Sequence, residues 1–200
     1  GDIKEICDLV YPTIGVVTAV GEMHLETFGS VENVLRTKFE LIDALPADGV
    51  GVENLDSEPI AAAKLSYPCR MVGYGVEAEI ADYRAEQINY TPSQTTFAIE
   101  SGEALREGYS THLAGRGNIL NLLAAVAVAD ALNVSEALQK RAMRQIEQIE
   151  HRLSIKRTAG GITIIDDAYN SNPTGAKMAL EVLHHFTRPA GARRIVVTPG

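Results

Sequence analysis

Several features that define other classes of protein are missing from this sequence of 200 residues. No apolar run approaches the roughly 18 residues of a membrane-spanning helix, and the first residues lack the basic-then-apolar pattern of a secretory signal. Only two cysteines occur, Cys7 and Cys69, and they stand too far apart to match a metal-ligand spacing. We therefore expect reduced thiols and a cytoplasmic location, with no membrane span.

Basic residues are few and scattered, and the formal net charge is −8. A nucleic-acid surface needs Lys and Arg gathered on one face, whereas the nearest pair, Arg193-Arg194, simply precedes an apolar stretch. No segment fits the phosphate-binding pattern G-x-x-x-x-G-K-[ST]. The sequence therefore predicts no nucleic-acid partner, and by itself it lacks the usual loop that holds a triphosphate.

The composition and the alternation of strand and helix patterns are typical of an α/β protein. The chain is 46% hydrophobic and 22% charged, which is ordinary for a globular protein of one or two domains. A helix that ends before Pro12 is followed by a β-branched apolar run over 14–20. A helical pattern over 31–45, with Ser30 as its N-cap, and a second strand over 49–53 come next. This alternation predicts a mostly parallel sheet flanked by helices.

The middle of the chain lacks helical periodicity. Between residues 69 and 114, short segments such as CRMVGYG, TTFAIE and YSTHLAG lie between turn-forming residues. We expect these segments to be antiparallel strands that extend the parallel sheet. Helical patterns return over 118–132 and 135–149, and the first is so uniformly apolar that it is predicted to be buried.

The strand-then-helix pattern then restarts, which predicts a second domain. A strand over 162–165, a polar loop, a helix over 174–186 and a strand over 195–198 follow in order. We expect a main domain over 1–151 and the beginning of a Rossmann-like domain over 152–200. The abrupt start and end of the pattern lead us to expect a fragment of a longer protein.

Two candidate sites follow the first predicted strand. Its carboxyl end leads into a loop with Glu22, His24 and Glu26, whose alternating polar groups could reach a metal or a phosphate-bound metal. A loop of this composition is also common on solvated surfaces, and that alternative stays open. Lys38 lies in the next predicted helix, where a lysine is ordinarily a surface residue.

Two further candidates lie in the second half of the chain. Residues 115–121 open the buried helix, where free backbone N–H groups favour an anion. Asn118 and Asn121 share one helical face, and their amides could read an adenine edge; alternatively, Asn118 caps the helix. Asp166 and Asp167 follow a predicted strand, where an acid often binds ribose hydroxyls, although this segment is polar enough to be a plain loop.

Taken in order, these segments resemble the Mur ligase superfamily over nearly the whole chain. The matching stretches are IGVVTAVGEMHLETFGS from residue 14, NLD at 54–56, GRGNILNLLAA at 115–125, and HRL at 151–153 followed by GGITIIDDAYNSNP. The wordings GE-x-HLE-x-FGS and DDAYN-x-NP are particular to the branch that adds D-alanyl-D-alanine. Four motifs in the family's order make a chance similarity a poor explanation.

The resemblance implies a role for each candidate residue, with ATP and Mg²⁺ as cofactors. His24 would help to hold magnesium, and Lys38 would be carbamylated, which turns its ammonium into a carboxylate-like anion that suits an oxygen-preferring metal. The residues implied to lie around ATP are Asn54 in the nucleotide pocket, Asn118 and Asn121 at the adenine, Arg152 at the phosphates, Asp167 at the ribose, and Tyr169 and Asn170 near the substrate junction.

The chain departs from the family at two of these places. Gly117 stands where the family usually has His, so that one nucleotide contact is lost or replaced. Ser57 stands where the family usually has a second acid after the Asn-x-Asp motif.

The resemblance also implies an activity. It is the ATP-dependent addition of D-alanyl-D-alanine to UDP-N-acetylmuramoyl-tripeptide through an acyl phosphate, in peptidoglycan precursor synthesis. Another amide ligase of the superfamily, similar to folylpolyglutamate synthase or to an earlier muramoyl amino-acid ligase, is one alternative. A non-catalytic nucleotide-binding fragment is the other, and we expect the 200 residues alone to be inactive. Closure of the two domains predicts a mobile hinge near 151–158.

Overall fold

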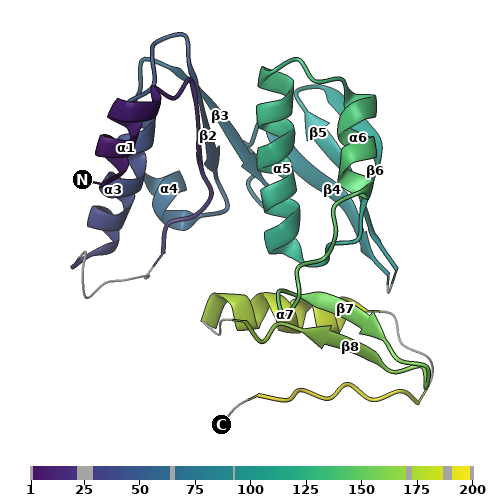
Figure 1. The fold of residues 1–200 in the computed structure, drawn as a ribbon. Helices are drawn as coiled ribbons and strands as arrows, with labels where there is room; N and C mark the ends of the chain where they lie inside the picture. The colour runs from purple at the N-terminus through teal and green to yellow at the C-terminus, as the bar shows by residue number, and fades with distance from the viewer. Residues whose placement is uncertain are drawn as a thin grey trace.

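The structure is a computed structural model that describes residues 2–21, 29–63, 66–91, 93–169, 173–186 and 191–198 (Figure 1). Its elements are, in chain order, α1 (Asp2–Val10), β1 (Ile14–Val17), α3 (Val31–Asp43), β2 (Val50–Asn54), α4 (Glu58–Ala62), β3 (Arg70–Gly75), β4 (Tyr83–Tyr90), β5 (Thr95–Ser101), β6 (Ala104–Thr111), α5 (Arg116–Ala131), α6 (Glu136–Arg144), β7 (Ser154–Arg157), β8 (Thr163–Asp166) and α7 (Pro173–His185). Within these ranges, no helix is both long and apolar enough to cross a membrane.

The main sheet has six strands in the spatial order β1-β2-β3-β4-β5-β6. The pairs from β1 to β4 are parallel and the last two pairs are antiparallel. The predicted mostly parallel sheet with an antiparallel extension is therefore confirmed. One strand was assigned the wrong direction, because the CRMVGYG segment forms β3, which runs parallel to β2. The connection through α4 carries the chain back along the sheet before β3 begins, which a parallel neighbour requires.

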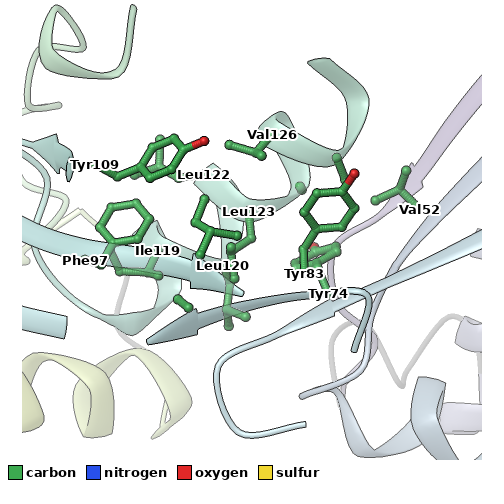
Figure 2. Packing of buried hydrophobic residues seen from close by; sticks show 14 of the residues in the cluster. Val52, Tyr74, Tyr83, Phe97, Tyr109, Ile119, Leu120, Leu122, Leu123 and Val126 are labelled. Carbon is green, nitrogen blue, oxygen red and sulfur yellow. The ribbon is translucent and has the colours of Figure 1, made fainter. Parts of the chain in front are cut away.

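Helices cover both faces of the main sheet because neighbouring side chains along each strand point to opposite faces. Val52 on β2 and Val72 on β3 belong to the apolar cluster that packs against α5 (Figure 2). Val17 on β1 and Met71 on β3 belong instead to the cluster formed with α3. Seven side chains of α5 are buried, so the predicted burial of this helix is confirmed.

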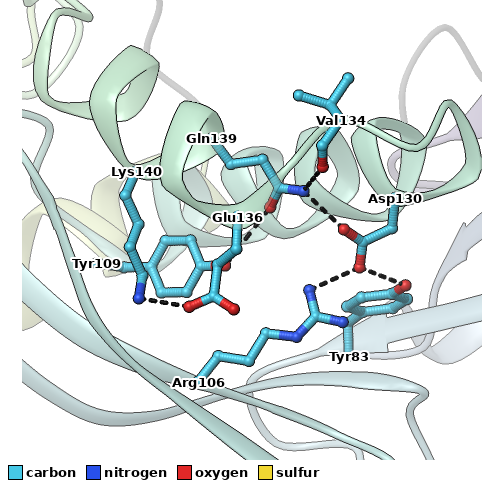
Figure 3. Close-up of polar contacts among 8 residues, drawn as sticks. All are labelled: Tyr83, Arg106, Tyr109, Asp130, Val134, Glu136, Gln139 and Lys140. Carbon is cyan, nitrogen blue, oxygen red and sulfur yellow. Dashed lines mark hydrogen bonds and ion pairs between the residues drawn. The ribbon is translucent and has the colours of Figure 1, made fainter.

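A polar network joins the antiparallel extension to α5 and α6 (Figure 3). The Asp130 carboxylate on α5 accepts hydrogen bonds from Tyr83 Oη at 2.9 Å, Arg106 Nη1 at 2.6 Å and Gln139 Nε2 at 2.6 Å. Tyr109 Oη in turn donates to Gln139 Oε1 at 3.4 Å. Since these side chains come from β4, β6, α5 and α6, one carboxylate holds four elements together.

The last three elements, β7, β8 and α7, form what we call the C-terminal unit. β7 pairs antiparallel with β8; the sequence analysis identified β8 and α7 but not β7, whose SIKR sequence has only one large apolar residue. The predicted strand over 195–198 is wrong, since the structure assigns no strand to residues 191–198. Its apolar residues are exposed, with 90% of Val197 accessible. A strand needs a hydrogen-bonded neighbour, and among the described residues no strand pairs with this segment. The division of the chain into domains at 151–152 stays a prediction.

Other predicted elements are correct in type and displaced at their ends. Ser30 is the N-cap of α3, and its Oγ accepts a hydrogen bond from Asn33 N at 3.2 Å. The first strand ends at Val17 instead of residue 20, and α6 ends at Arg144 instead of residue 149. α5 begins two residues early, at Arg116. Such ends depend on capping and tertiary contacts more than on apolar periodicity.

Candidate functional site

The backbone that follows β1 is held by side chains from two neighbouring elements. Asn54, at the end of β2, is 5% exposed and donates from Nδ2 to the Thr18 carbonyl oxygen at 2.8 Å. Lys38, on α3, donates from Nζ to the next carbonyl oxygen, that of Ala19, at 2.6 Å. Two predicted site residues are therefore brought to consecutive peptides at the carboxyl edge of the parallel strands.

Ser57, one of the two departures from the family, holds the next peptide of the same segment. Its Oγ lies 3.2 Å from both the N and the O of Val20, accepting from the amide and donating to the carbonyl. A hydroxyl can do both, whereas a carboxylate can only accept. Ser57 therefore has a local structural use that an acid at this position could not fully replace.

Partial burial changes the titration of Lys38. The side chain is half-buried, and this burial lowers the pKa of its amine below the ordinary lysine value. A neutral amine is the form that reacts with CO₂ to give a carbamate, since an ammonium has no free electron pair. The residue is thus chemically suited to the predicted carbamylation, which itself stays a prediction.

The predicted magnesium site has few of its ligands among the described residues. His24, like Glu22 and Glu26, lies outside the described ranges. In the part of the chain that the structure describes, no group of three or more His, Cys, Asp or Glu side chains is placed to hold a metal. An unmodified lysine ammonium repels a cation, so Lys38 fits a metal-binding role only as its carbamate.

Asp56 organises the turn beside this edge, although the sequence analysis assigned it no role. Its Oδ2 accepts from Val76 N, and its Oδ1 accepts from Glu77 N and Ala78 N, each at 3.0 Å. Gly75 allows the approach, because a Cβ there would lie 2.5 Å from Asp56 Oδ1. The sequence signals were the NLD motif and the position of its aspartate two residues after the end of β2, and neither reveals which amides Asp56 binds.

Replacing Asp56 with Ala is expected to lower the free energy of unfolding by about 2 kcal/mol, since three amides lose a charged acceptor. Urea unfolding would measure the loss, and hydrogen exchange should accelerate at residues 76–78. Asp48→Ala, at an exposed position, is the matched control. Unchanged exchange at residues 76–78 in Asp56→Ala would contradict this account.

The N-terminus of α5 carries two of the predicted nucleotide contacts. Asn118 is not the N-cap; that position belongs to Gly115, which has a φ of 90°. Asn118 Nδ2 donates to the Ala114 carbonyl oxygen at 2.7 Å, which uses one N–H of the amide. Asn121 is exposed, and Arg116 forms an ion pair with Glu77.

The C-terminal unit brings three more predicted residues together near its junction with the main sheet. The guanidinium carbon of Arg152 lies 4.2 Å from the centre of the Tyr169 ring, in a cation–π contact. Tyr169 N donates to the His151 carbonyl oxygen at 3.0 Å, and Leu153 N donates to Asp167 Oδ1 at 3.1 Å. Asn170, the fourth predicted residue of this segment, lies outside the described residues.

A chain of contacts links these groups of residues. Asn54 Oδ1 accepts from Asp56 N at 3.0 Å, and Asp56 binds the amide of Glu77, which is paired with Arg116 on α5. On the other side of the α5 N-terminus, Leu153 packs so closely on Gly115 that a Cβ there would lie 2.9 Å from Leu153 Cδ1. The described candidates therefore lie along one connected path from β1 to the C-terminal unit.

Two surface hollows are lined by residues other than the predicted site residues. One of about 350 Å³ is lined by residues of β4, β5 and β6, and one of about 610 Å³ lies beside α3 and Tyr67. Neither is lined by a predicted site residue. The connected path, rather than either hollow, is the candidate site.

Comparison with known proteins gives consistent matches along the chain. The family described as Mur ligase middle domain matches residues 1–129. A UDP-N-acetylmuramate--L-alanine ligase of Desulforapulum autotrophicum is 33% identical over 84% of this chain and 37% of its own length. A UDP-N-acetylmuramoyl-tripeptide--D-alanyl-D-alanine ligase of Bacillus subtilis is 28% identical over 91% of this chain and 38% of its own length.

Solved structures of similar fold agree with these matches. The MurF ligase from Thermotoga maritima in complex with ADP has a TM-score of 0.78 and 23% identity, covering 94% of this chain and 42% of that one. MurF from Acinetobacter baumannii has a TM-score of 0.75 and 27% identity, covering 92% of this chain and 40% of that one. The chain spans about two fifths of the length of these relatives.

Proposed function

The chain belongs to the Mur ligase family, and on that basis we propose that the protein is an ATP-dependent amide ligase of peptidoglycan precursor synthesis. The observation that carries the proposal is the connected path from Lys38 and Asn54, through the N-terminus of α5, to Arg152 and Asp167. Its contacts link amide, basic and acidic side chains from separate elements to the N-terminal end of α5. A nucleotide offers complementary groups in its adenine edge, its phosphates and its ribose hydroxyls.

In the proposed reaction, a carboxylate oxygen of the UDP-linked substrate attacks the γ-phosphorus of ATP and ADP leaves. The amine of the second substrate then attacks the acyl carbon, and phosphate leaves as the amide forms. Magnesium, when bound, neutralises charge on the transferring phosphoryl group. Arg152 adds a cation beside the phosphates, Asp167 accepts from the ribose, and Asn118 and Asn121 orient the adenine. Lys38, as a carbamate, and His24 would be the side chains that hold the magnesium ion.

For the second substrate we propose D-alanyl-D-alanine, added to UDP-N-acetylmuramoyl-tripeptide. The support is the wording GE-x-HLE-x-FGS and DDAYN-x-NP in this sequence. A second candidate is the addition of L-alanine to UDP-N-acetylmuramate, favoured by the 33% identity to a ligase of that name. The two differ in the amine and in the muramoyl substrate, so one assay separates them.

The test is phosphate release from ATP by the full-length gene product with each matched pair of substrates. We expect release with the tripeptide substrate that depends on added D-alanyl-D-alanine, and none with UDP-muramate and L-alanine. The opposite pattern would establish the second candidate. Turnover that ignores both amines, or no turnover with either pair, would leave a binding role as the better explanation.

A further inference from the structure

The C-terminal unit docks on the main sheet at the N-terminus of α5. Ala114, Val182 and Phe186 are buried together there, and Tyr90 and Leu153 pack against them. The unit thus meets the first turn of the helix that carries Asn118 and Asn121 (Figure 1). The docking surface is apolar and small, so its fit depends on a few close contacts.

Two glycines make the close approach possible. A Cβ on Gly115 would lie 2.9 Å from Leu153 Cδ1 and 3.1 Å from Val182 Cγ2. A Cβ on Gly117 would lie 3.1 Å from Met178 Sδ, which is already tighter than an ordinary contact. An Ala at position 117 would require Met178 Sδ to move by a few tenths of an ångström, and a larger side chain that extends toward α7 would have to displace the Met178 side chain further.

The junction before the unit contains a turn with unusual backbone angles, and the mobile hinge expected near 151–158 stays a prediction. His151 and Leu153 have φ values of 61° and 51°, in the left-handed region that costs non-glycine residues free energy. Asp167 accepts from Leu153 N, and His151 Nδ1 lies 2.9 Å from Asp166 Oδ2. These contacts keep the strained turn in place, so the approach of α7 to α5 is specified from the linker side as well.

A polar strap spans the same junction. Gln148 Nε2 donates to the His112 carbonyl oxygen at 3.0 Å, and its Oε1 accepts from Ile155 N at 2.6 Å. The strap joins the loop after β6 to the second residue of β7. Movement of the unit away from α5 would therefore stretch or break the two hydrogen bonds of Gln148.

We propose that Gly117 and Met178 are a size-matched pair that sets how closely the C-terminal unit docks on the N-terminus of α5. Both act as positioning residues. The pair determines the distance from the two asparagines on α5, Asn118 and Asn121, to the two charged residues of the unit, Arg152 and Asp167. The importance of that gap for ATP rests on the proposed function, whereas the docking distance itself does not.

The test measures the docking distance by double electron–electron resonance. Nitroxide spin labels are attached to the cysteines of the double variant Ala125→Cys, Lys177→Cys of the full-length protein. Both positions are exposed, and the natural cysteines, Cys7 and Cys69, are buried and need no label. We expect Gly117→Leu to shift the distance distribution to longer values, and added Met178→Ala to return it to the original. Ala137→Leu, at an exposed position of α6, should leave the distribution unchanged.

An unchanged distribution in Gly117→Leu, or a longer one that Met178→Ala does not restore, would overturn the pairing. If melting by circular dichroism shows that Gly117→Leu unfolds, Met178→Phe applies the same push from α7 and should give the same shift. Affinity for a fluorescent ADP analogue, measured on the full-length protein, is expected to fall and recover with the distance. If the distance lengthens and recovers while the affinity for the ADP analogue stays constant, the Gly117–Met178 pairing is supported and the proposed nucleotide site is contradicted.

Discussion

Lys38→Ala is expected to lower the rate of ATP-derived phosphate release by the full-length protein roughly 10²–10³-fold, the usual loss when a charge-stabilising group is removed from a site. The reason is local. Lys38 reaches the Ala19 carbonyl at 2.6 Å, at the start of the segment that leads to His24. Burial lowers the pKa of its amine and so enlarges the neutral fraction that can take up CO₂. Loss of the side chain removes the proposed carbamate oxygens.

If Lys38 acts as a carbamate, a second result is expected for Lys38→Ala. Because a small carboxylate carries similar oxygens, added formate or acetate should restore part of the activity of Lys38→Ala, and depletion of CO₂ should slow the natural protein only. Lys140→Ala is the matched control, since Lys140 pairs with Glu136 on α6, on another part of the molecule. Activity of Lys38→Ala within a few-fold of the natural protein would remove this lysine from the mechanism.

Asp130→Ala is expected to lower the free energy of unfolding by about 3 kcal/mol, the lower end of the range for breaking one side of a buried ion pair, because this pair is only partly buried. The Asp130 side chain is 20% exposed, and its loss leaves the Arg106 guanidinium without its carboxylate. Tyr83 and Gln139 lose an acceptor as well. Urea unfolding followed by circular dichroism would measure the change.

The matched control is Asp8→Ala, which removes the exposed ion pair between Lys4 and Asp8 on α1. Pairs of that kind contribute about 0–1 kcal/mol. Equal losses in the two variants would show that the network in Figure 3 adds nothing beyond a surface ion pair.

The Asp130 network also predicts a dependence on pH. Burial acts to raise the pKa of the Asp130 carboxyl, but hydrogen bonds from Gln139, Arg106 and Tyr83 outweigh it and hold the pKa below the ordinary aspartate value. A depressed folded-state pKa stabilises the fold above the unfolded-state pKa of about 3.9. That stabilisation is lost as the pH falls through the folded-state value. The difference in stability between the natural protein and Asp130→Asn should therefore be full at neutral pH and shrink below about pH 4.

Local pattern was sufficient for much of the fold. The uniformly apolar sequence of α5 predicted its burial, because a helix with no polar face must be enclosed. Ser30 marked the beginning of α3, since its hydroxyl can serve an amide three residues later. Short apolar runs ended by polar residues located β1, β2 and β8 to within a few residues. The candidate residues Lys38, Asn54, Arg152 and Asp167 came from the family resemblance of their motifs.

Properties that depend on a distant partner were not accessible in this way. The direction of β3 follows from the path of the chain through α4. Residues 195–198 form no strand, and within the described part of the chain no strand pairs with them. Asp56 was recognised as part of the NLD motif, but nothing in the motif shows that it accepts hydrogen bonds from three amides about twenty residues further along the chain.

By itself, then, the sequence determined the kind of most elements, the α/β class and the family, because periodicity, capping and motifs are properties of neighbouring residues. The tertiary structure alone decided which amides Asp56 holds, where Asp130 finds its three donors, and that Gly117 faces Met178. Those outcomes depend on how closely elements approach in space. A separation of a few ångströms between residues as far apart in the sequence as Gly117 and Met178 leaves no trace in local pattern.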